Sequence, residues 1–334
     1  MKVAIIGAGL QCRRRAPVIK ECAETELAVI ADRTSAKAEA AAKAFGCAAV
    51  KTWQEAVSRE DIGIVLVCTP PYAHAEISIA ALRAGKHVLC EKPLARTLAE
   101  ADEMIAVARE NNRIFKCGFN HRHHPAIWQA KMAVDQGVIG QPLFARCRYG
   151  ICGRPGYEKE WRADPNQTAG GQFIEQGTHA IDLFLWFLGE ITEAVGMTSR
   201  RFFTGQPLDE DGMAIFRTAS AATASLHSSL TQWKNLFSFE VFGRDGYVII
   251  EGLGTSYGTE RLIVGKRDFN APFNESVTEF RGNDISWKEE WKEFTAAISE
   301  GREPLGNGAD GRKALRIAMA VYESEKTGRI VRLV

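Results

Sequence analysis

The first 120 residues alternate short apolar runs with segments of helical periodicity. Such short apolar runs have the length of buried strands, and helical segments between them supply the crossovers that parallel strands require. This alternation predicts a doubly wound α/β sheet. Thr97 and Glu100 have the spacing of a capping box, which marks a helix start. The predicted strands span 2–6, 27–31, 62–68, 87–90 and 114–117, and the predicted helices span 13–22, 35–45, 73–84 and 97–111.

From about residue 119 the alternation of strands and helices ends, which indicates a second domain. After a loop rich in glycine, proline and charge, short strands bounded by turn signals follow one another, which is typical of an antiparallel sheet. Strands are predicted at 143–149, 191–203, 213–217, 223–230, 237–242, 247–251 and 261–264, and helices at 125–136, 286–299 and 309–326. We therefore expect the doubly wound domain to span 1–120 and, at 121–334, an α+β domain with a large open, mainly antiparallel sheet.

A glycine-rich turn follows the first predicted strand. Gly7, Gly9 and Cys12 occupy the glycine positions of a dinucleotide-binding GxGxxG turn, and Asp32 directly follows the second predicted strand. The helix after the turn offers unpaired N–H groups to a pyrophosphate. A carboxylate at Asp32 accepts hydrogen bonds from the ribose and repels a 2′-phosphate, which favours NAD over NADP, although Arg33 offsets part of that repulsion. The alternative is an ordinary glycine-rich turn with a solvated aspartate.

Composition narrows the range of partners. Lys and Arg number 42 and Asp and Glu 41, and this net charge of +1 predicts neither nucleic-acid binding nor attraction to a membrane. Glycines break the first apolar run after a few residues, so we expect no signal peptide and a cytoplasmic location. The eight cysteines form no CxxC pair, so neither a disulfide framework nor a zinc site is expected.

Longer stretches of the chain carry a resemblance. Residues 68–74 read CTPPYAH and residues 84–94 read AGKHVLCEKPL, in which Glu91-Lys92-Pro93 is the most specific signature. With the segments 118–125, 170–171 and 175–179, the whole chain resembles the glucose–fructose oxidoreductase/inositol dehydrogenase (Gfo/Idh/MocA) family. The resemblance implies an NAD-dependent oxidoreductase that transfers hydride between nicotinamide and a secondary hydroxyl or ketone of a sugar, polyol or nucleotide sugar.

The resemblance also implies that Lys92, His179 and Glu175 carry catalysis. In the family the Lys-Pro pair is typically cis and the lysine contacts the reacting hydroxyl, where an ammonium stabilises developing alkoxide charge. His179 shares a helix face with Glu175 and Asp182, and an imidazole that titrates near neutrality suits removal of the hydroxyl proton. The family usually carries Asp where Glu175 stands, so its direct part in proton transfer stays open. The alternatives are a surface-loop lysine and a hydrogen-bonded core histidine.

Further residues follow from the turn and the resemblance. Cofactor contacts are expected at Gly7, Gly9, Leu10, Gln11, Asp32, Arg33, Thr69, Pro70, His74, Glu91, Lys92 and Asn120. Substrate contacts are expected at Lys92, Arg122, Trp161, Arg162, Glu175 and His179. Trp161 could stack on a sugar and Arg162 could bind a polar group, or both could pack their loop. One arginine of 13–15 could reach a phosphate, with the others solvated.

No metal site is expected from the histidines at 121, 123 and 124, because their spacing is not that of a known metal motif. Two other functions stay open through the resemblance: a redox-neutral NAD-dependent glycoside hydrolase and a non-catalytic NAD-binding regulator. The presence of both Lys92 and His179 argues against the regulator.

The second half of the chain also predicts self-association. Polar Thr223, Ser225 and His227 alternate with apolar Ala224 and Leu226. A large open sheet exposes a face and edges unless another surface covers them, so we expect a homo-oligomer, a dimer or a tetramer, assembled through this sheet.

Overall fold

The computed structural model describes residues 1–333, and Val334, with which the predicted second domain ends, lies outside the described residues. The chain forms two compact units. Unit 1 comprises Met1–Asn120, Asn166–Ala169 and Trp287–Arg312. Unit 2 comprises His121–Pro165, Gly170–Ser286 and the chain from Lys313 onward. Unit 1 therefore takes up residues that follow unit 2 in sequence.

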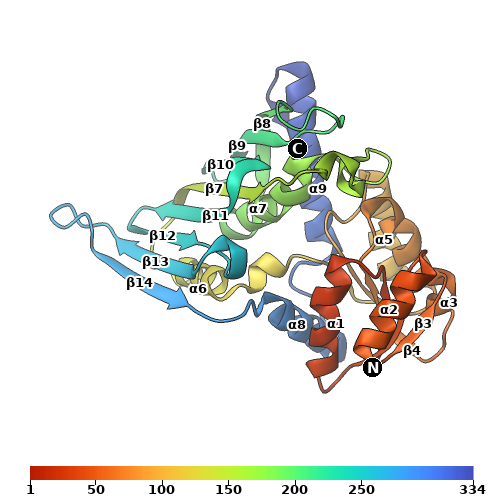
Figure 1. Cartoon of the computed structure of the whole chain (residues 1–334). Helices are drawn as coiled ribbons and strands as arrows, with labels where there is room; N and C mark the ends of the chain where they lie inside the picture. Colours follow the sequence, from red (N-terminus) through yellow and green to blue (C-terminus); the bar gives the residue numbers. More distant parts are fainter. Residues whose placement is uncertain (334) are drawn as a thin grey trace. The chain divides into compact units, whose positions relative to one another are not determined.

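Unit 1 is built on a six-stranded parallel sheet with the order β3-β2-β1-β4-β5-β6. Its strands are β1 (Lys2–Ile6), β2 (Glu26–Ala31), β3 (Ala48–Val50), β4 (Ile62–Val67), β5 (His87–Cys90) and β6 (Phe115–Cys117). Its helices are α1 (Leu10–Glu21), α2 (Ser35–Phe45), α3 (Trp53–Val57), η1 (Pro71–Ala73), α4 (His74–Arg83), α5 (Leu98–Glu110) and nearly all of α8 (Ser286–Glu300). Figure 1 labels two strands of this sheet, β3 and β4, and the helices α1, α2, α3, α5 and α8. The strand order reverses between β1 and β4, where open α/β sheets bind ligands beyond the carboxyl ends of the strands.

The predicted doubly wound α/β fold is confirmed, and α5 begins with the predicted capping box between Thr97 and Glu100. Sequence periodicity missed β3 and α3. Both are too short to show a period, since β3 has three residues and α3 has five.

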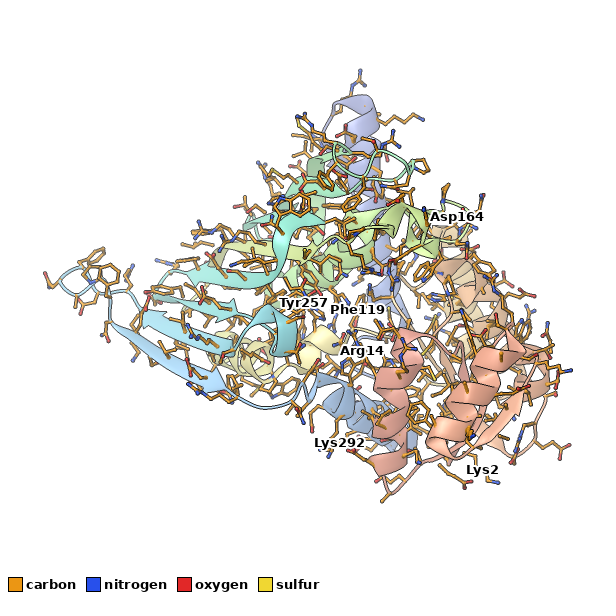
Figure 2. All side chains as sticks on the ribbon, in the orientation of Figure 1. Lys2, Arg14, Phe119, Asp164, Tyr257 and Lys292 are labelled. Atoms are coloured by element: carbon orange, nitrogen blue, oxygen red, sulfur yellow. The ribbon has the colours of Figure 1, made fainter. Side chains whose placement is uncertain are left out.

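Helix α8 completes the core of unit 1 from far along the sequence. Trp291 and Phe294 are 1% and 0% exposed and pack in a cluster that includes Ile19 of α1. The indole of Trp291 donates a hydrogen bond to Thr25 Oγ1 at 3.2 Å. Lys292, labelled in Figure 2, is exposed on the same helix. Burying each aromatic ring contributes roughly 2–3 kcal/mol to folding.

Unit 2 contains a nine-stranded sheet with the order β14-β13-β12-β11-β7-β10-β9-β8-β15. Its strands are β7 (Pro142–Cys152), β8 (Ile191–Ser199), β9 (Asp211–Thr218), β10 (Thr223–Ser229), β11 (Thr231–Gly243), β12 (Gly246–Glu251), β13 (Glu260–Lys266), β14 (Glu275–Phe280) and β15 (Val331–Arg332). Its helices are α6 (Pro125–Asp135), η3 (Tyr157–Lys159), η4 (Trp161–Ala163), α7 (Gln172–Leu188) and η5 (Thr255–Tyr257). Two further helices, η2 (Asn120–His123) and α9 (Gly308–Thr327), include residues of both units.

The sheet of unit 2 is antiparallel except at β7 and β10, which pair in parallel, so the predicted mainly antiparallel sheet is confirmed. Helix α7 packs against β7, β9 and β10. Along β9, Phe216 is buried, whereas Met213 and Ile215 are 55% and 58% exposed, so the other face of the sheet is open. Sequence patterning missed β14, because most of its residues are exposed and it lacks an apolar face. No helix within residues 1–333 is long and apolar enough to cross a bilayer.

We expect Phe294→Ala to lower the free energy of unfolding by about 3–5 kcal/mol, because it leaves a cavity under α8. The matched control is Phe273→Ala, since Phe273 is 88% exposed, and its expected effect is within about 0.5 kcal/mol. Urea unfolding curves of both variants measure the difference. Equal effects would contradict the role of α8 in this core.

Candidate cofactor and substrate sites

The turn after β1 has the geometry that its glycines predict. Gly7 has φ +104°, and a Cβ there would lie 2.7 Å from the carbonyl oxygen of Cys68, so a side chain does not fit. The N–H of Gly7 donates to the carbonyl of Ala31 at 2.7 Å, which joins the turn to β2. Cys12, at the third glycine position, is fully buried, and burial raises the pKa of its thiol to about 12. It packs there as a small apolar side chain.

The N-terminus of α1 is suited to an anion. Gly9 is the N-cap, no side chain caps the helix and no acidic residue lies in its first turn. A Cβ on Gly9 would meet no atom within 4 Å, so open space faces the backbone. Leu10 is 46% exposed, and the buried Oε1 of Gln11 has no hydrogen-bond partner in the described chain. Unpaired N–H groups, an uncompensated helix dipole and open space fit a dinucleotide pyrophosphate.

Asp32 is held in place at the end of β2. Its Oδ2 accepts from the N–H of Ala8 at 2.9 Å and its Oδ1 accepts from the N–H of Thr34 at 2.8 Å. The carboxylate is thereby attached to the glycine-rich turn. Arg33 is exposed, and its Nη1 lies 3.4 Å from the hydroxyl of Tyr72. This arrangement suits a ribose diol better than a 2′-phosphate.

His74 connects the loops that follow β4 and β5. Its Nδ1 lies 2.9 Å from the carbonyl oxygen of Pro93, and its Nε2 lies 2.8 Å from that of Thr69. The ring is 0% exposed and burial lowers the pKa of His74, whereas the two carbonyl oxygens oppose that shift, because each can only accept a hydrogen bond from the ring. Pro70 lies in the same loop, where the buried hydroxyl of Thr69 has no partner within residues 1–333. His74 therefore holds two loops at the carboxyl edge of the sheet.

Lys92 directly follows Glu91 at the end of β5, and the Lys92–Pro93 peptide bond is cis, as the resemblance implied. Lys92 is half-buried and Asn120 is 3% exposed. The carboxylate of Glu91 lies 2.7 Å from the guanidinium of Arg15.

The three arginines of α1 have different surroundings. Arg13 and Arg14 are exposed, the latter labelled in Figure 2, whereas Arg15 is 2% exposed. Arg15 lies in the interior of unit 1 instead of on a phosphate-facing or solvated surface.

In unit 2, helix α7 begins at a tight contact. The carboxylate of Asp209 accepts from the N–H groups of Gly171 and Phe173, at 3.2 and 2.8 Å, and from the Tyr322 hydroxyl at 2.8 Å. A Cβ on Gly171 would lie 2.3 Å from the Asp209 carbonyl oxygen, so only glycine fits. Sequence reasoning missed Asp209, because an aspartate in a loop far from the helix start gives no capping signal.

His179, on α7, is 4% exposed and lies against a second imidazole. The rings of His179 and His121 stack with centroids 3.8 Å apart, and His121 Nε2 lies 3.0 Å from the hydroxyl of Tyr149. His124 Nδ1 lies 3.0 Å from Glu260 Oε2. Among residues 1–333, no group of three His, Cys, Asp or Glu side chains is arranged to hold a metal ion. The contact between His121 and His179 could not be read from sequence spacing.

Arg122 and Asp182 form a buried ion pair in unit 2. Arg122 Nε and Nη2 donate to the two carboxylate oxygens of Asp182 at 2.8 and 2.5 Å. The guanidinium also lies 5.4 Å from the ring centroid of Trp186. Arg122 was predicted to contact substrate, and the structure engages its guanidinium with α7.

Glu175, Arg162 and Trp161 form a second group in unit 2. Arg162 Nε lies 3.5 Å from Glu175 Oε1, and its guanidinium lies 4.3 Å from the ring centroid of Trp161. Glu160 contributes a further carboxylate, 3.6 Å from Arg162 Nη1. All four side chains are partly exposed or bordering solvent, which leaves this group able to meet a polar ligand.

Comparison with known proteins defines the class. Residues 1–119 match the model of an oxidoreductase family with an NAD-binding Rossmann fold, and residues 127–249 match the GFO/IDH/MocA C-terminal domain. Levoglucosan dehydrogenase of Pseudarthrobacter phenanthrenivorans is 28% identical over 89% of this chain and 86% of that protein. The dTDP-3,4-didehydro-2,6-dideoxy-alpha-D-glucose 3-reductase of Actinomadura kijaniata is 33% identical over 68% of this chain and 67% of that protein. A structure of levoglucosan dehydrogenase with NADH and levoglucosan superposes with a TM-score of 0.91, at 24% identity, over 100% of this chain and 99% of that one.

The protein is an NAD-dependent oxidoreductase that acts on CH–OH groups. It belongs to the Gfo/Idh/MocA family, which confirms the predicted resemblance.

We expect Asp32→Ser to raise the affinity for NADPH relative to NADH by about tenfold, because it removes the carboxylate that repels a 2′-phosphate. Fluorescence titration with each reduced cofactor measures the two dissociation constants without a substrate. Asp61→Asn, an exposed carboxylate elsewhere in unit 1, is the control. An unchanged ratio for Asp32→Ser would contradict its placement at the ribose.

Proposed function

We propose that this enzyme transfers a hydride between NAD and a secondary hydroxyl of a sugar, polyol or nucleotide sugar, or reduces the matching ketone. The observation that carries the proposal is the place of Lys92 in unit 1. It follows β5 at the carboxyl edge of the sheet that also carries the uncapped N-terminus of α1. NAD, when bound, supplies the hydride acceptor.

In this proposal the ammonium of Lys92 contacts the oxygen of the reacting hydroxyl. A positive charge beside that oxygen stabilises the alkoxide character that develops as the O–H proton leaves, before hydride transfer from the carbon turns the alkoxide into a carbonyl. A half-buried position makes the charge more effective than it would be in water. The anchored neighbours Glu91 and Pro93 support this role, because they limit the conformations of the Lys92 backbone.

In this proposal His179 accepts the proton of the reacting hydroxyl. A buried imidazole on a helix is a suitable general base, since its reference pKa is near neutrality. The stacked ring of His121 supports a fixed ring orientation for His179. Glu175 acts in this proposal on Arg162 and the substrate and not as the base.

The substrate class rests on two arguments. The relatives named above act, by their names, on levoglucosan and on a deoxy nucleotide sugar. In this chain, the aromatic ring of Trp161, the guanidinium of Arg162 and the carboxylate of Glu175 lie together. Such a group offers a stacking surface and hydrogen-bonding groups to a polyhydroxylated ligand. A cytoplasmic location is part of the proposal, supported by eight free thiols.

We expect purified enzyme with NAD to produce NADH with at least one member of a panel of anhydrosugars, aldoses, inositols and nucleotide sugars. Lys92→Ala and His179→Ala are each expected to lower kcat/KM by about 100-fold or more, since each removes a group that acts in the transition state. Lys51→Ala, an exposed lysine in the same unit, is the control with unchanged turnover. Absorbance at the NADH band measures all three.

Other outcomes separate the alternatives. Glycoside cleavage that requires NAD without net NADH would identify a redox-neutral hydrolase. A protein that binds NAD, turns over no member of the panel and keeps its NAD affinity in Lys92→Ala and His179→Ala would favour the non-catalytic regulator.

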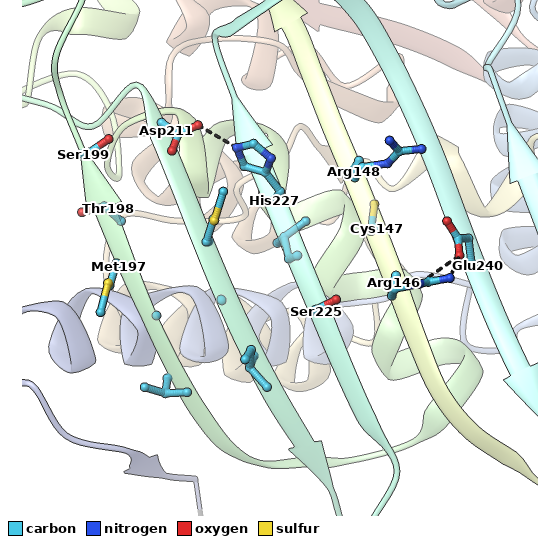
Figure 3. Close-up of a pocket in the computed structure, with 16 residues that line it drawn as sticks. Arg146, Cys147, Arg148, Met197, Thr198, Ser199, Asp211, Ser225, His227 and Glu240 are labelled. Atoms are coloured by element: carbon cyan, nitrogen blue, oxygen red, sulfur yellow. Dashed lines mark hydrogen bonds and ion pairs between the residues drawn. The ribbon is translucent and has the colours of Figure 1, made fainter.

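We also propose that the open sheet face of unit 2 joins a second copy of the chain. A groove of about 790 Å³ runs over β7, β8, β9 and β10, and Met197, Met213 and Ile215 are among the residues that line it. Figure 3 labels Met197 in this groove. Two polar pairs flank this apolar strip, His227 with Asp211 and Arg146 with Glu240. An apolar centre with polar margins is typical of a homodimer interface. None of the predicted cofactor or substrate residues lines this groove.

We expect wild-type protein to elute as a dimer or tetramer and Ile215→Glu to shift it toward monomer, because the new carboxylate would be buried without a partner. Multi-angle light scattering after size-exclusion chromatography measures the mass. Phe273→Glu places the same charge on an exposed loop and leaves the mass unchanged. A monomeric wild-type protein at working concentration would refute the assembly.

A further inference from the structure

A buried cluster of charges lies beneath the loop that carries Lys92. Arg15 of α1 donates from Nε to Glu91 Oε1 at 2.7 Å and from Nη1 to Glu290 Oε2 at 2.7 Å. The exposed fractions of the Arg15, Glu91 and Glu290 residues are 2%, 5% and 0%. The guanidinium of Arg15 therefore joins α1, Glu91 and helix α8.

The surrounding groups leave this guanidinium little freedom. A Cβ on Gly118 would lie 3.0 Å from Arg15 Nη2 and 3.2 Å from Glu91 Oε2, so the chain after β6 closes over the pair. On the other side, the ring centroid of Trp287 lies 4.7 Å from the Arg15 guanidinium carbon. Burial opposes the charge of Arg15, but Glu290 and Glu91 outweigh it and raise the pKa of Arg15. The cation is thus held in one place and stays charged.

The backbone around Lys92 is anchored on both sides. The Glu91 side chain is fixed by Arg15, and the Glu91 N–H donates to the carbonyl of Val67 at 3.0 Å. On the other side, the carbonyl of Pro93 lies 2.9 Å from His74 Nδ1. Lys92 is the single residue between these two anchors, so the position of its ammonium depends on both.

We infer that Arg15 is a positioning residue for Lys92: it orders the loop through Glu91 and so sets where the ammonium lies relative to α1, whose N-terminus receives the cofactor. The inference rests on the role of Lys92 in the proposed function. An arginine suits the task, because its planar fork bonds two carboxylates in different directions, which the ammonium of lysine does with less geometric constraint.

The first test reads the position of Lys92 without turnover. Reductive methylation with ¹³C-formaldehyde gives each lysine a dimethylamino NMR signal, and Lys92→Arg identifies the one from residue 92. We expect Arg15→Met to move that signal toward the position of exposed lysines, and Arg15→Lys to move it part of the way. Arg14→Met, which removes an exposed guanidinium 5.7 Å from the same Trp287 ring centroid, leaves it unchanged.

The second test uses NADH affinity and, once the panel has given a substrate, turnover. We expect Arg15→Lys to lower kcat at least tenfold, with the NADH dissociation constant within threefold of wild type. The deuterium isotope effect on kcat should rise, because a displaced ammonium slows the C–H step. A purely structural role would instead lower kcat in proportion to the folded fraction, with the isotope effect unchanged.

The two tests fail separately. An unmoved Lys92 signal in folded Arg15→Met or Arg15→Lys overturns the inference even if Lys92→Ala is inactive. Full turnover by Lys92→Ala overturns the proposed function, whereas the NMR comparison still decides whether Arg15 positions the lysine. If Arg15→Met does not fold, Arg15→Lys decides the result.

Discussion

The guanidinium of Arg15 lies between the buried carboxylates of Glu91 and Glu290, and this contact joins α1, the residue after β5 and α8 in the interior of unit 1. Removing one member of a buried ion pair costs about 3–5 kcal/mol, because the remaining charge is desolvated without compensation. A well-packed apolar trio could match the stability of these charges. It would not fix the direction of the loop, since apolar contacts are not directional. With the proposed role of Lys92, these three charges are therefore better explained by the fixed direction that they give its loop than by stability.

Helix α7 in unit 2 is held by polar contacts in a similar way. Asp209 caps its first turn, and Arg122 donates two hydrogen bonds to Asp182 farther along the helix. Glu175 and His179 lie between these two attachments. Both units thus place their candidate functional side chains on segments that are attached on either side, which keeps such groups close to one geometry.

Local signals made much of this predictable. The apolar runs of β1, β4 and β5, the glycine at position 7 and the capping box at Thr97 each depend on neighbours within a few residues, and each was read correctly. The surroundings of Arg15 were not predictable, because its partner Glu290 is 275 residues away in sequence. The same holds for Asp209 and for the stacking of His121 on His179. Spacing along a helix places side chains on a face, but only the assembled sheet decides what meets that face.

The return of α8 to unit 1 has a consequence for biosynthesis. As the chain leaves the ribosome, the first 120 residues emerge with Ile19 uncovered and with Arg15 lacking Glu290, since Trp291, Phe294 and Glu290 are made only after residue 286. Unit 1 therefore stays incomplete while nearly all of unit 2 is translated. Completion of the dinucleotide-binding fold thus requires synthesis of the residues of unit 2 that precede α8. A message truncated before α8 yields unit 1 without that helix.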